Sequence, residues 1–487
     1  MRLGFEHSYA SLSPELYQRV LPTPVKDPKL VIFNRTLADE LGLKPDVERE
    51  AATLFSGNQV PEDSNPIAMA YAGHQFGSFV PQLGDGRAIL LGELKGHTGV
   101  LRDVQLKGAG LTRFSRDGDG RAALGPMLRE YLISEAMHAL GIPTTRSLAV
   151  VATGEQVFRA TSVPGAVLAR VAASHVRVGT FQFFAARGDL DAVHELLDYV
   201  IARHYPDARD AAVPALDVLK AVVLRQAALI ADWIRVGFIH GVMNTDNMAI
   251  SGETIDYGPC AFMDHYHPNT VFSSIDRVGR YSYANQSAIA QWNLARFAET
   301  LLPLIDVDTD KAVGLATEVL ESFTAEFNAR YLDRLCRKIG LINGSERDSD
   351  LVNRLFAAMQ EASADFTLTF RRLARVVESP GSESALRELF ARSSQIDGWL
   401  RDWRERLASD PQGVTERVMS MRRVNPAFIP RNHRVEAALT AAEHGDFDPF
   451  HQLHGILQRP YDDQPDVADY EQPPQPSERV LRTFCGT

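Results

Sequence analysis

The spacing of apolar residues predicts strands in the first third of the chain and helices in most of the remainder. Apolar runs and alternating residues bounded by glycines predict strands over residues 88–94, 102–107 and 147–170, the last as three shorter runs. Helical spacing covers residues 31–43, 121–141, 187–237 and 286–440. We therefore expect the α+β class, with a β-rich region followed by a helical region.

One stretch after a long apolar segment has the spacing of a kinase catalytic loop. A kinase has H-R-D-x-x-x-x-N and then D-F-G. Here His240 lies seven residues before Asn247, and residues 256–258 have the sequence DYG. Val242 stands where a kinase keeps its base, and a valine cannot accept a proton, whereas Asp246 directly precedes Asn247. The pattern predicts the metal-binding half of a kinase site with a relocated base.

A glycine-rich segment and a lysine-bearing strand lie upstream. Residues 73–96 contain Gly84 and Gly86, followed by Arg87, and this spacing is typical of a plain β-turn or of a phosphate-binding loop. The arginine favours phosphate. Lys107 ends an alternating run, as a kinase phosphate-binding lysine does, although a solvated surface lysine has the same pattern.

Other charged residues extend the comparison with a kinase. Glu130 and Glu135 lie on the predicted helix 121–141, and we expect one of them to pair with the lysine. Arg170 and Arg177 are seven residues apart, which suits either a phosphate clamp or two surface arginines.

A pair of histidines, His265 and His267, has no evident third metal ligand. The sequence therefore favours hydrogen-bonded surface histidines over a metal site.

Composition narrows the class of protein. The 487 residues suggest two or three subdomains, and 45% hydrophobic and 23% charged residues are typical of a soluble globular protein. A net charge of −11 argues against nucleic-acid binding. No apolar run reaches the roughly 18 residues of a membrane span, and the N-terminus has no export signal. Three cysteines cannot form a disulfide framework or a four-cysteine zinc site, so we expect a reducing cytoplasm.

These features divide the chain into five predicted parts. Residues 1–70 are an N-terminal extension, and residues 71–172 are a kinase-like small lobe with the lysine strand and the glutamate helix. Residues 173–300 are a kinase-like large lobe that carries the catalytic and metal-binding loops. Residues 301–458 are a helical extension, and residues 459–487 are a Pro-rich acidic tail, extended or mobile, that ends near Cys485.

Several long blocks, in order, closely resemble the selenoprotein O family of kinase-like protein adenylyltransferases. The resemblance covers almost the whole chain. Its blocks are GHQFGSFVPQLGDGRA (73–88), QLKGAGLTRFSRDGDGRA (105–122), REYLISEAM (129–137), ARVAASHVRVGTF (169–181), HGVMNTDNM (240–248), IDYGP (255–259) and MRRVNPAFIPRN (421–432).

The resemblance implies a two-lobed pseudokinase fold that binds ATP in a flipped orientation and transfers AMP to Ser, Thr or Tyr hydroxyls of proteins. It implies Asp246 as the base and Asn247 and Asp256 as ligands of Mg²⁺ or Mn²⁺, oxygen ligands that suit these cations. The nucleotide contacts that it implies are Gly84, Gly86, Arg87, Lys107, Asp119, Gly120, Glu130, Arg170, Arg177 and Asp256.

The resemblance also suggests a regulatory disulfide between Cys260 and Cys485, with two free thiols as the alternative. We expect protein substrates, no nucleic acid, no membrane and a monomer. Three alternatives stay open: UMP transfer from UTP with Mn²⁺, true phosphotransfer, and a non-catalytic pseudokinase scaffold. The metal-binding residues argue against the scaffold.

Overall fold

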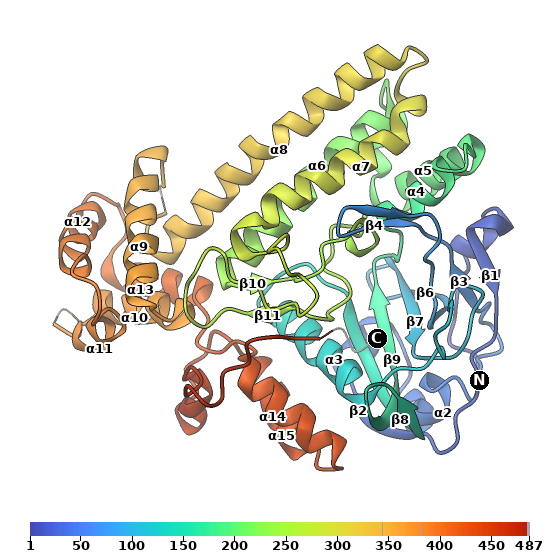
Figure 1. Ribbon diagram of the computed structural model, residues 1–487, viewed down its shortest axis with the longest axis horizontal. Coiled ribbons are helices and arrows are strands. Elements are labelled where there is room, and N and C mark those ends of the chain that lie inside the picture. Colours follow the sequence, from blue (N-terminus) through green and yellow to red (C-terminus); the bar gives the residue numbers. More distant parts are fainter. Residues whose placement is uncertain (343, 380, 485–487) are drawn as a thin grey trace.

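The computed structural model describes residues 1–342, 344–379 and 381–484, and its centre is a seven-stranded antiparallel sheet (Figure 1). The strand order is β1-β3-β6-β7-β9-β8-β2. The strands are β1 (Tyr17–Arg19), β2 (Lys29–Phe33), β3 (Ile67–Met69), β6 (Ala88–Lys95), β7 (Leu101–Lys107), β8 (Arg146–Phe158) and β9 (Ser162–Ala172).

The register of β7 and β9 brings two of the predicted site residues to one face of the sheet. Gln105 lies opposite Arg170, and Lys107 follows two residues later on β7. Because side chains alternate along a strand, all three lie on the same face. Val104 and Leu106 point to the other face, into a core cluster that includes residues of α1 (Arg35–Glu40) and α2 (Asp46–Phe55).

Helix α3 (Leu124–Ala139) packs against β8 and β9. Both apolar and charged side chains of α3 are buried, including Glu130 and Glu135. The sheet is therefore covered by α1 and α2 on one face and by α3 on the other.

The second half of the chain is helical, as the sequence predicted. Helices α6, α7 and α8 are long and pack side by side (Figure 1). The helices after α3 are α4 (Val178–Ala185), α5 (Leu190–His204), α6 (Pro214–Val236), α7 (Gln286–Ile305), α8 (Thr309–Lys338), α9 (Ser349–Ala362), α10 (Phe366–Glu378), α11 (Ser384–Leu389), α12 (Ile396–Ala408), α13 (Val414–Val424), α14 (Asn432–Glu443) and α15 (Asp448–Leu457).

Short elements connect these layers. Two small hairpins pair β4 (Gly73–Gln75) with β5 (Ser78–Val80) and β10 (Phe238–Ile239) with β11 (Ala261–Phe262). Short 3₁₀ segments cover Tyr9–Ser11, Pro14–Leu16, Pro206–Asp210, Thr245–Asn247, Tyr283–Asn285, Glu346–Asp348 and Pro465–Glu471, the last with a kink at Val467. No helix within the described ranges is long and apolar enough to cross a membrane.

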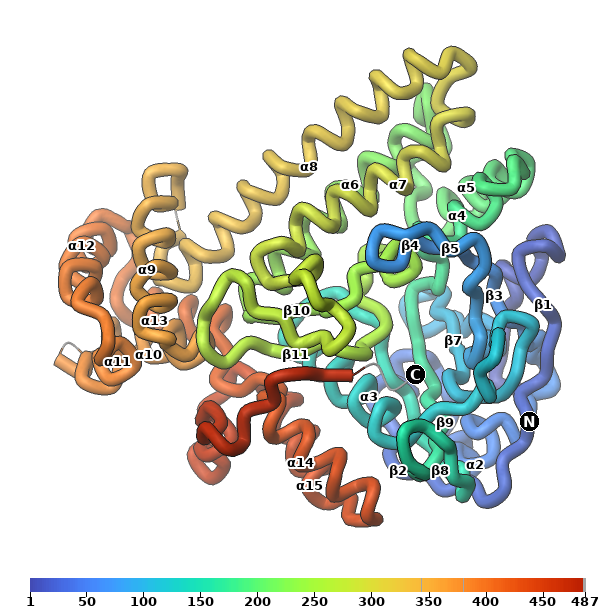
Figure 2. The backbone as a smooth tube through the Cα atoms, in the orientation of Figure 1, coloured from blue at the N-terminus to red at the C-terminus, as the bar shows by residue number. Residues whose placement is uncertain are grey.

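The C-terminal part of the chain packs against helix α3, which covers one face of the sheet. Helices α14 and α15 pack against α3, and Figure 2 shows this red segment beside the cyan helix. Thr483 then forms a parallel bridge with Ser273. Residues more than 300 positions apart thus border the same region.

Three local predictions were wrong in part. Residues 31–43 form the end of β2 and then α1, because residues 29–33 pair with β8. Residues 147–170 belong to two strands, not three, because the expected turns are a register shift inside β8 and a paired part of β9. The tail is not simply extended, since Pro465–Glu471 is a 3₁₀ turn. The mixed α and β content is confirmed, while the kinase-like lobes and the domain limits stay predictions.

Arg431 anchors the tail and gives a stability prediction. This arginine is 1% exposed, and its guanidinium donates to the Asp365 carboxylate at 2.9 and 3.2 Å, to Asp264 and to the carbonyl of Glu471 at 2.9 Å. Arg431→Ala leaves the buried Asp365 carboxylate and the partly buried Asp264 carboxylate without their cation, which costs about 3–5 kcal/mol. We expect the thermal unfolding midpoint to fall by several degrees, whereas the exposed Arg423→Ala control leaves it unchanged. An unchanged midpoint in Arg431→Ala would contradict this role.

Candidate functional site

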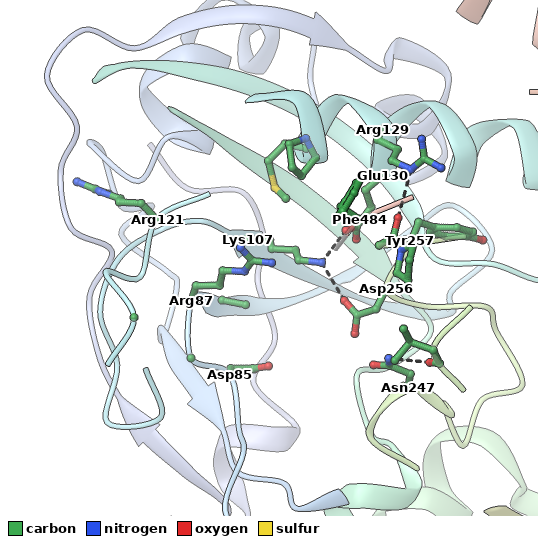
Figure 3. Close-up of a pocket in the computed structure, with 18 of the residues that line it drawn as sticks. Asp85, Arg87, Lys107, Arg121, Arg129, Glu130, Asn247, Asp256, Tyr257 and Phe484 are labelled. Carbon is green, nitrogen blue, oxygen red and sulfur yellow. Dashed lines mark hydrogen bonds and ion pairs between the residues drawn. The ribbon is translucent and has the colours of Figure 1, made fainter. Parts of the chain in front are cut away.

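A cavity of about 1070 Å³ lies between the sheet, α3, the loop that follows β10 and helix α14. Figure 3 shows part of its lining. The cavity brings together all twelve residues predicted to bind nucleotide or metal or to act in catalysis, namely Gly84, Gly86, Arg87, Lys107, Asp119, Gly120, Glu130, Arg170, Arg177, Asp246, Asn247 and Asp256.

Three cations converge on the carboxylate of Asp256. Lys107 Nζ lies 2.9 Å from Asp256 Oδ1 (Figure 3), and Arg170 Nη1 lies 2.7 Å from the same oxygen. Arg177 Nη1 lies 3.1 Å from the other oxygen, Oδ2. Glu130 completes the cluster, since its carboxylate lies 2.6 Å from Lys107 Nζ and 3.2 Å from Arg170 Nη1. The predicted pairing of the lysine with a helix glutamate is therefore confirmed for Glu130.

Electrostatics keep Asp256 ionised. Burial opposes its ionisation, but the charges of Lys107, Arg170 and Arg177 outweigh burial and hold the pKa of Asp256 well below its ordinary value. The backbone of Asp256 has a φ of +62°, which is uncommon outside glycine. This strained conformation places the carboxylate among the cations.

Asp246 has a different environment. It is 7% exposed, its Oδ1 has no hydrogen-bond partner among the described residues, and its Oδ2 lies 3.5 Å from Gln75 Nε2. Burial raises the pKa of Asp246 to about 6. Arg177 does not pair with this carboxylate but donates to the backbone carbonyl of Asp246 at 2.9 Å. A buried carboxyl with an unused oxygen and a pKa near neutrality is suited to accept a proton.

The neighbouring residues are held by backbone contacts. Asn247 Nδ2 donates to the Val242 carbonyl at 3.0 Å, so its amide oxygen remains the free acceptor. His240 is buried, burial lowers its pKa, and its Nε2 donates to the Ile255 carbonyl at 2.8 Å. His240 thus joins the loop that carries Asp246 to the segment that carries Asp256.

The donor set fits a hard divalent cation. The Asn247 amide oxygen and the Asp256 carboxylate are oxygen donors of the kind that Mg²⁺ and Mn²⁺ prefer. No group of three or more His, Cys, Asp or Glu within the described ranges is arranged as a metal site. Such a cation therefore needs further oxygens from a ligand, as Mg²⁺ commonly takes them from phosphates.

Two loops line the cavity, one around Gly84 and one between β7 and α3. Gly84 has a φ of +83°, and a Cβ there would lie 2.4 Å from the Phe114 ring. Gly120 has a φ of +71°, and a Cβ there would lie 2.2 Å from the Gly110 carbonyl carbon. A larger residue at Gly84 would push its loop away from Phe114, and one at Gly120 would open the loop between β7 and α3, to which Gly110 also belongs. Arg87 lines the cavity without an ion-pair partner in the described part of the chain, whereas Asp119 pairs with Arg159 at 2.9 Å.

Sequence reasoning missed several lining residues. Asp85 is 3% exposed and accepts from Gln105 Nε2 at 3.0 Å and from the Met69 backbone at 3.1 Å. Its position between two glycines was a usable signal. The Tyr71 ring lies 4.5 Å from the Arg177 guanidinium. Glu436, Leu439, Thr440 and Glu443 of α14 also line the cavity, and no local motif indicated them.

Two open alternatives are settled by contacts. Glu135 pairs with Arg146 at 2.8 Å and not with Lys107. His265 contacts Arg479, with 3.0 Å between His265 Nε2 and an Arg479 guanidinium nitrogen, which favours a hydrogen-bonded histidine over a metal ligand.

Only one cysteine of the predicted disulfide, Cys260, lies within the described residues. Cys485 lies outside the described residues, so its pairing with Cys260 stays a prediction. Cys260 is fully buried, and burial raises the pKa of its thiol to about 11. Thr483 Oγ1 donates to the Pro259 carbonyl at 2.6 Å, so the described end of the tail lies beside this cysteine.

A buried cluster of basic side chains beside a carboxyl group of raised pKa makes this cavity a candidate anion-binding site, and comparison with known proteins places the chain in a family. A family model described as protein adenylyltransferase SelO matches residues 1–458. A Rhizobium meliloti (strain 1021) protein named protein nucleotidyltransferase YdiU is 61% identical over 485 residues, which cover 99% of each chain. A protein of the same name from Bradyrhizobium sp. (strain ORS 278) is 60% identical over 486 residues, again 99% of each chain. The chain belongs to the SelO family.

The environment of Cys260 predicts slow alkylation. Each pKa unit above the working pH lowers the thiolate fraction about tenfold, and the thiolate is the form that reacts. In reducing buffer near pH 8, we expect iodoacetamide to label Cys260 at least about 100-fold more slowly in the folded protein than after denaturation. Peptide mass spectrometry measures both rates, and fast labelling of the folded protein would contradict the burial.

Proposed function

We propose that this protein is a protein adenylyltransferase, which transfers AMP from ATP to a Ser, Thr or Tyr hydroxyl of a protein acceptor. The observation that carries the proposal is the convergence of Lys107, Arg170 and Arg177 in the same cavity as the buried Asp246 carboxylate. The SelO family description names an adenylyltransferase, and the related proteins are named protein nucleotidyltransferases. Those names support nucleotidyl transfer and leave the preferred base to experiment.

The charge distribution suits a deeply held polyphosphate. The three basic side chains that contact the Asp256 carboxylate can exchange it for phosphate oxygens. Arg87 adds a further cation, which has no ion-pair partner among the described residues. If the γ- and β-phosphates occupy the cation cluster, the α-phosphate faces Asp246. This is the flipped orientation that the family resemblance implies.

In the proposed reaction, the acceptor hydroxyl oxygen attacks the α-phosphorus of ATP. Asp246 takes the hydroxyl proton as the new oxygen–phosphorus bond forms. The bond between the α-phosphorus and the bridging oxygen breaks, and pyrophosphate leaves with the bonding electrons. Lys107, Arg170 and Arg177 stabilise the charge that develops on the leaving oxygens.

Asn247 and Asp256 are the residues that would hold Mg²⁺ or Mn²⁺ together with phosphate oxygens. When bound, the cation supplies positive charge that neutralises the phosphates. With the cation held there, the Asp256 carboxylate would face the metal, and Lys107, Arg170 and Arg177 would be free to bind phosphate oxygens.

Asp246→Asn tests the proposed base. Asparagine keeps the size of the side chain but cannot take the proton, so the rate of AMP transfer falls about 10²–10⁴-fold. We expect ATP affinity, measured by calorimetry, to stay within a few-fold of wild type because the phosphate-binding cations are untouched. Asp232→Asn, which alters a carboxylate paired with Arg334 away from the cavity, is the matched control. Full transfer activity in Asp246→Asn would refute the assignment.

The pKa of Asp246 sets the pH dependence. A base must be ionised, and burial raises this pKa to about 6, so the carboxylate is protonated below that value and active above it. The initial rate of AMP transfer should rise with pH through a midpoint at or below about pH 6, because a nearby cation lowers the pKa of the carboxyl group, and should level off about one pH unit above that midpoint. A midpoint above about pH 7, or a rate that falls as the pH rises from about 5 to about 8, would disagree with this assignment.

A further inference from the structure

The hairpin of β4 and β5 has a location that its glycines did not predict. The sequence suggested a turn or a phosphate loop for this segment. In the structure its backbone lies against the loop that carries Asp246. A Cβ on Gly73 would lie 2.5 Å from Asp246 Oδ1, and a Cβ on Gly179 of α4 would lie 2.1 Å from the Ala72 carbonyl. Glycines at these positions allow the hairpin and α4 to enclose the carboxylate closely.

A closed ring of three hydrogen bonds joins these elements. The His74 backbone N–H donates to Thr245 Oγ1 at 2.7 Å. The Thr245 hydroxyl donates to Gln182 Oε1 at 2.6 Å, and Gln182 Nε2 donates to His74 Nδ1 at 2.9 Å. The ring therefore links β4, α4 and the loop residue that directly precedes Asp246.

Each member of the ring is fixed. Thr245 is fully buried and Gln182 is 5% exposed. The Thr245 hydroxyl accepts one bond and donates another, so its proton and one of its two lone pairs are used. The His74 ring packs against Trp292 with 5.2 Å between ring centroids. Water competes little for the buried bond between Thr245 and Gln182, and the two bonds of His74 are partly buried.

Asn244, in the same loop, makes a second set of contacts. Asn244 Oδ1 accepts from the Phe76 backbone at 3.0 Å and from the Tyr281 hydroxyl at 2.6 Å. The two residues before Asp246 are thus both attached to the hairpin. The Asp246 carboxylate has, among the described residues, only the 3.5 Å contact of its Oδ2 with Gln75, so its aim depends on the backbone that carries it.

We propose that the His74–Gln182–Thr245 ring positions Asp246 for proton transfer. This inference rests on the proposed function, in which Asp246 is the base. The three residues act through Asp246 and touch neither the acceptor nor the nucleotide. Their substitution therefore lowers the rate of the chemical step and spares nucleotide binding, because misplacing a catalytic group by about 1 Å costs about 10²-fold in rate.

Thr245→Val is the first test. Valine has nearly the shape of threonine but can neither donate nor accept, so the His74 N–H and Gln182 Oε1 lose their partner. We measure self-labelling from ATP labelled at the α-phosphate, as a function of ATP concentration. The maximal rate should fall at least about tenfold with an unchanged KM for ATP, and Thr245→Ser, which restores the hydroxyl, should recover most of the rate.

Two further variants make the test specific. Gln182→Met removes the amide but keeps the bond between His74 and Thr245. It should show the fall in rate that is predicted for Thr245→Val, and it replaces that variant if Thr245→Val does not fold. Thr300→Val removes a buried hydroxyl whose bond is to the Phe297 carbonyl of its own helix, and it should label at the wild-type rate. In an Asp246→Ala background, Thr245→Val should cause no further loss.

The outcomes separate the two hypotheses. A wild-type rate in both Thr245→Val and Gln182→Met, with Asp246→Ala inactive, overturns the positioning role and leaves the proposed function intact. Equal losses of rate and ATP affinity in both variants also overturn it, since they indicate general disruption. Full activity in Asp246→Ala overturns the base assignment and this inference together.

Discussion

The ion cluster around Asp256 is the interaction on which the rest of the site depends. One carboxylate holds three cations from three segments, namely Lys107 of β7, Arg170 of β9 and Arg177 before α4. Without the Asp256 carboxylate or another anion between them, these three positive charges would repel each other at such distances. The carboxylate therefore keeps the cations assembled, and the strained backbone at Asp256 is stabilised by the contacts that it makes possible.

The fold provides this cluster by simple geometric means. Antiparallel pairing places Arg170 beside Gln105, and alternation brings Lys107 to the same face of the sheet. Helix α3 packs on that face and supplies Glu130. The loop after β10 brings Asp246 and Asn247 into the same cavity, and α14 lines it from the C-terminal part of the chain. The cavity is thus built from contacts across the whole sequence.

Local patterns predicted much of this arrangement. Alternation identified the strand of Lys107, helical spacing identified α3, and the spacing from His240 to Asn247 identified the loop of Asp246. Other features depend on distant contacts. Residues 29–33 form a strand because β8 pairs with them, although their apolar spacing continues into a helical pattern. No local rule places Thr440 at the cavity. Gly73 begins the glycine-rich segment that the sequence indicated, but the reason for a glycine at this position, the close approach of Asp246, appears only in three dimensions.

The orientation of the nucleotide is the central claim, because it decides which phosphorus faces Asp246. The most direct measurement incubates the protein and a general acceptor protein with Mg²⁺ and ATP labelled at either the α- or the γ-phosphate, followed by gel autoradiography. Our account predicts label on protein from the α-phosphate and none from the γ-phosphate. Label from the γ-phosphate alone would show ordinary phosphotransfer and contradict the account, and label from neither, with ATP binding retained, would favour a non-catalytic scaffold.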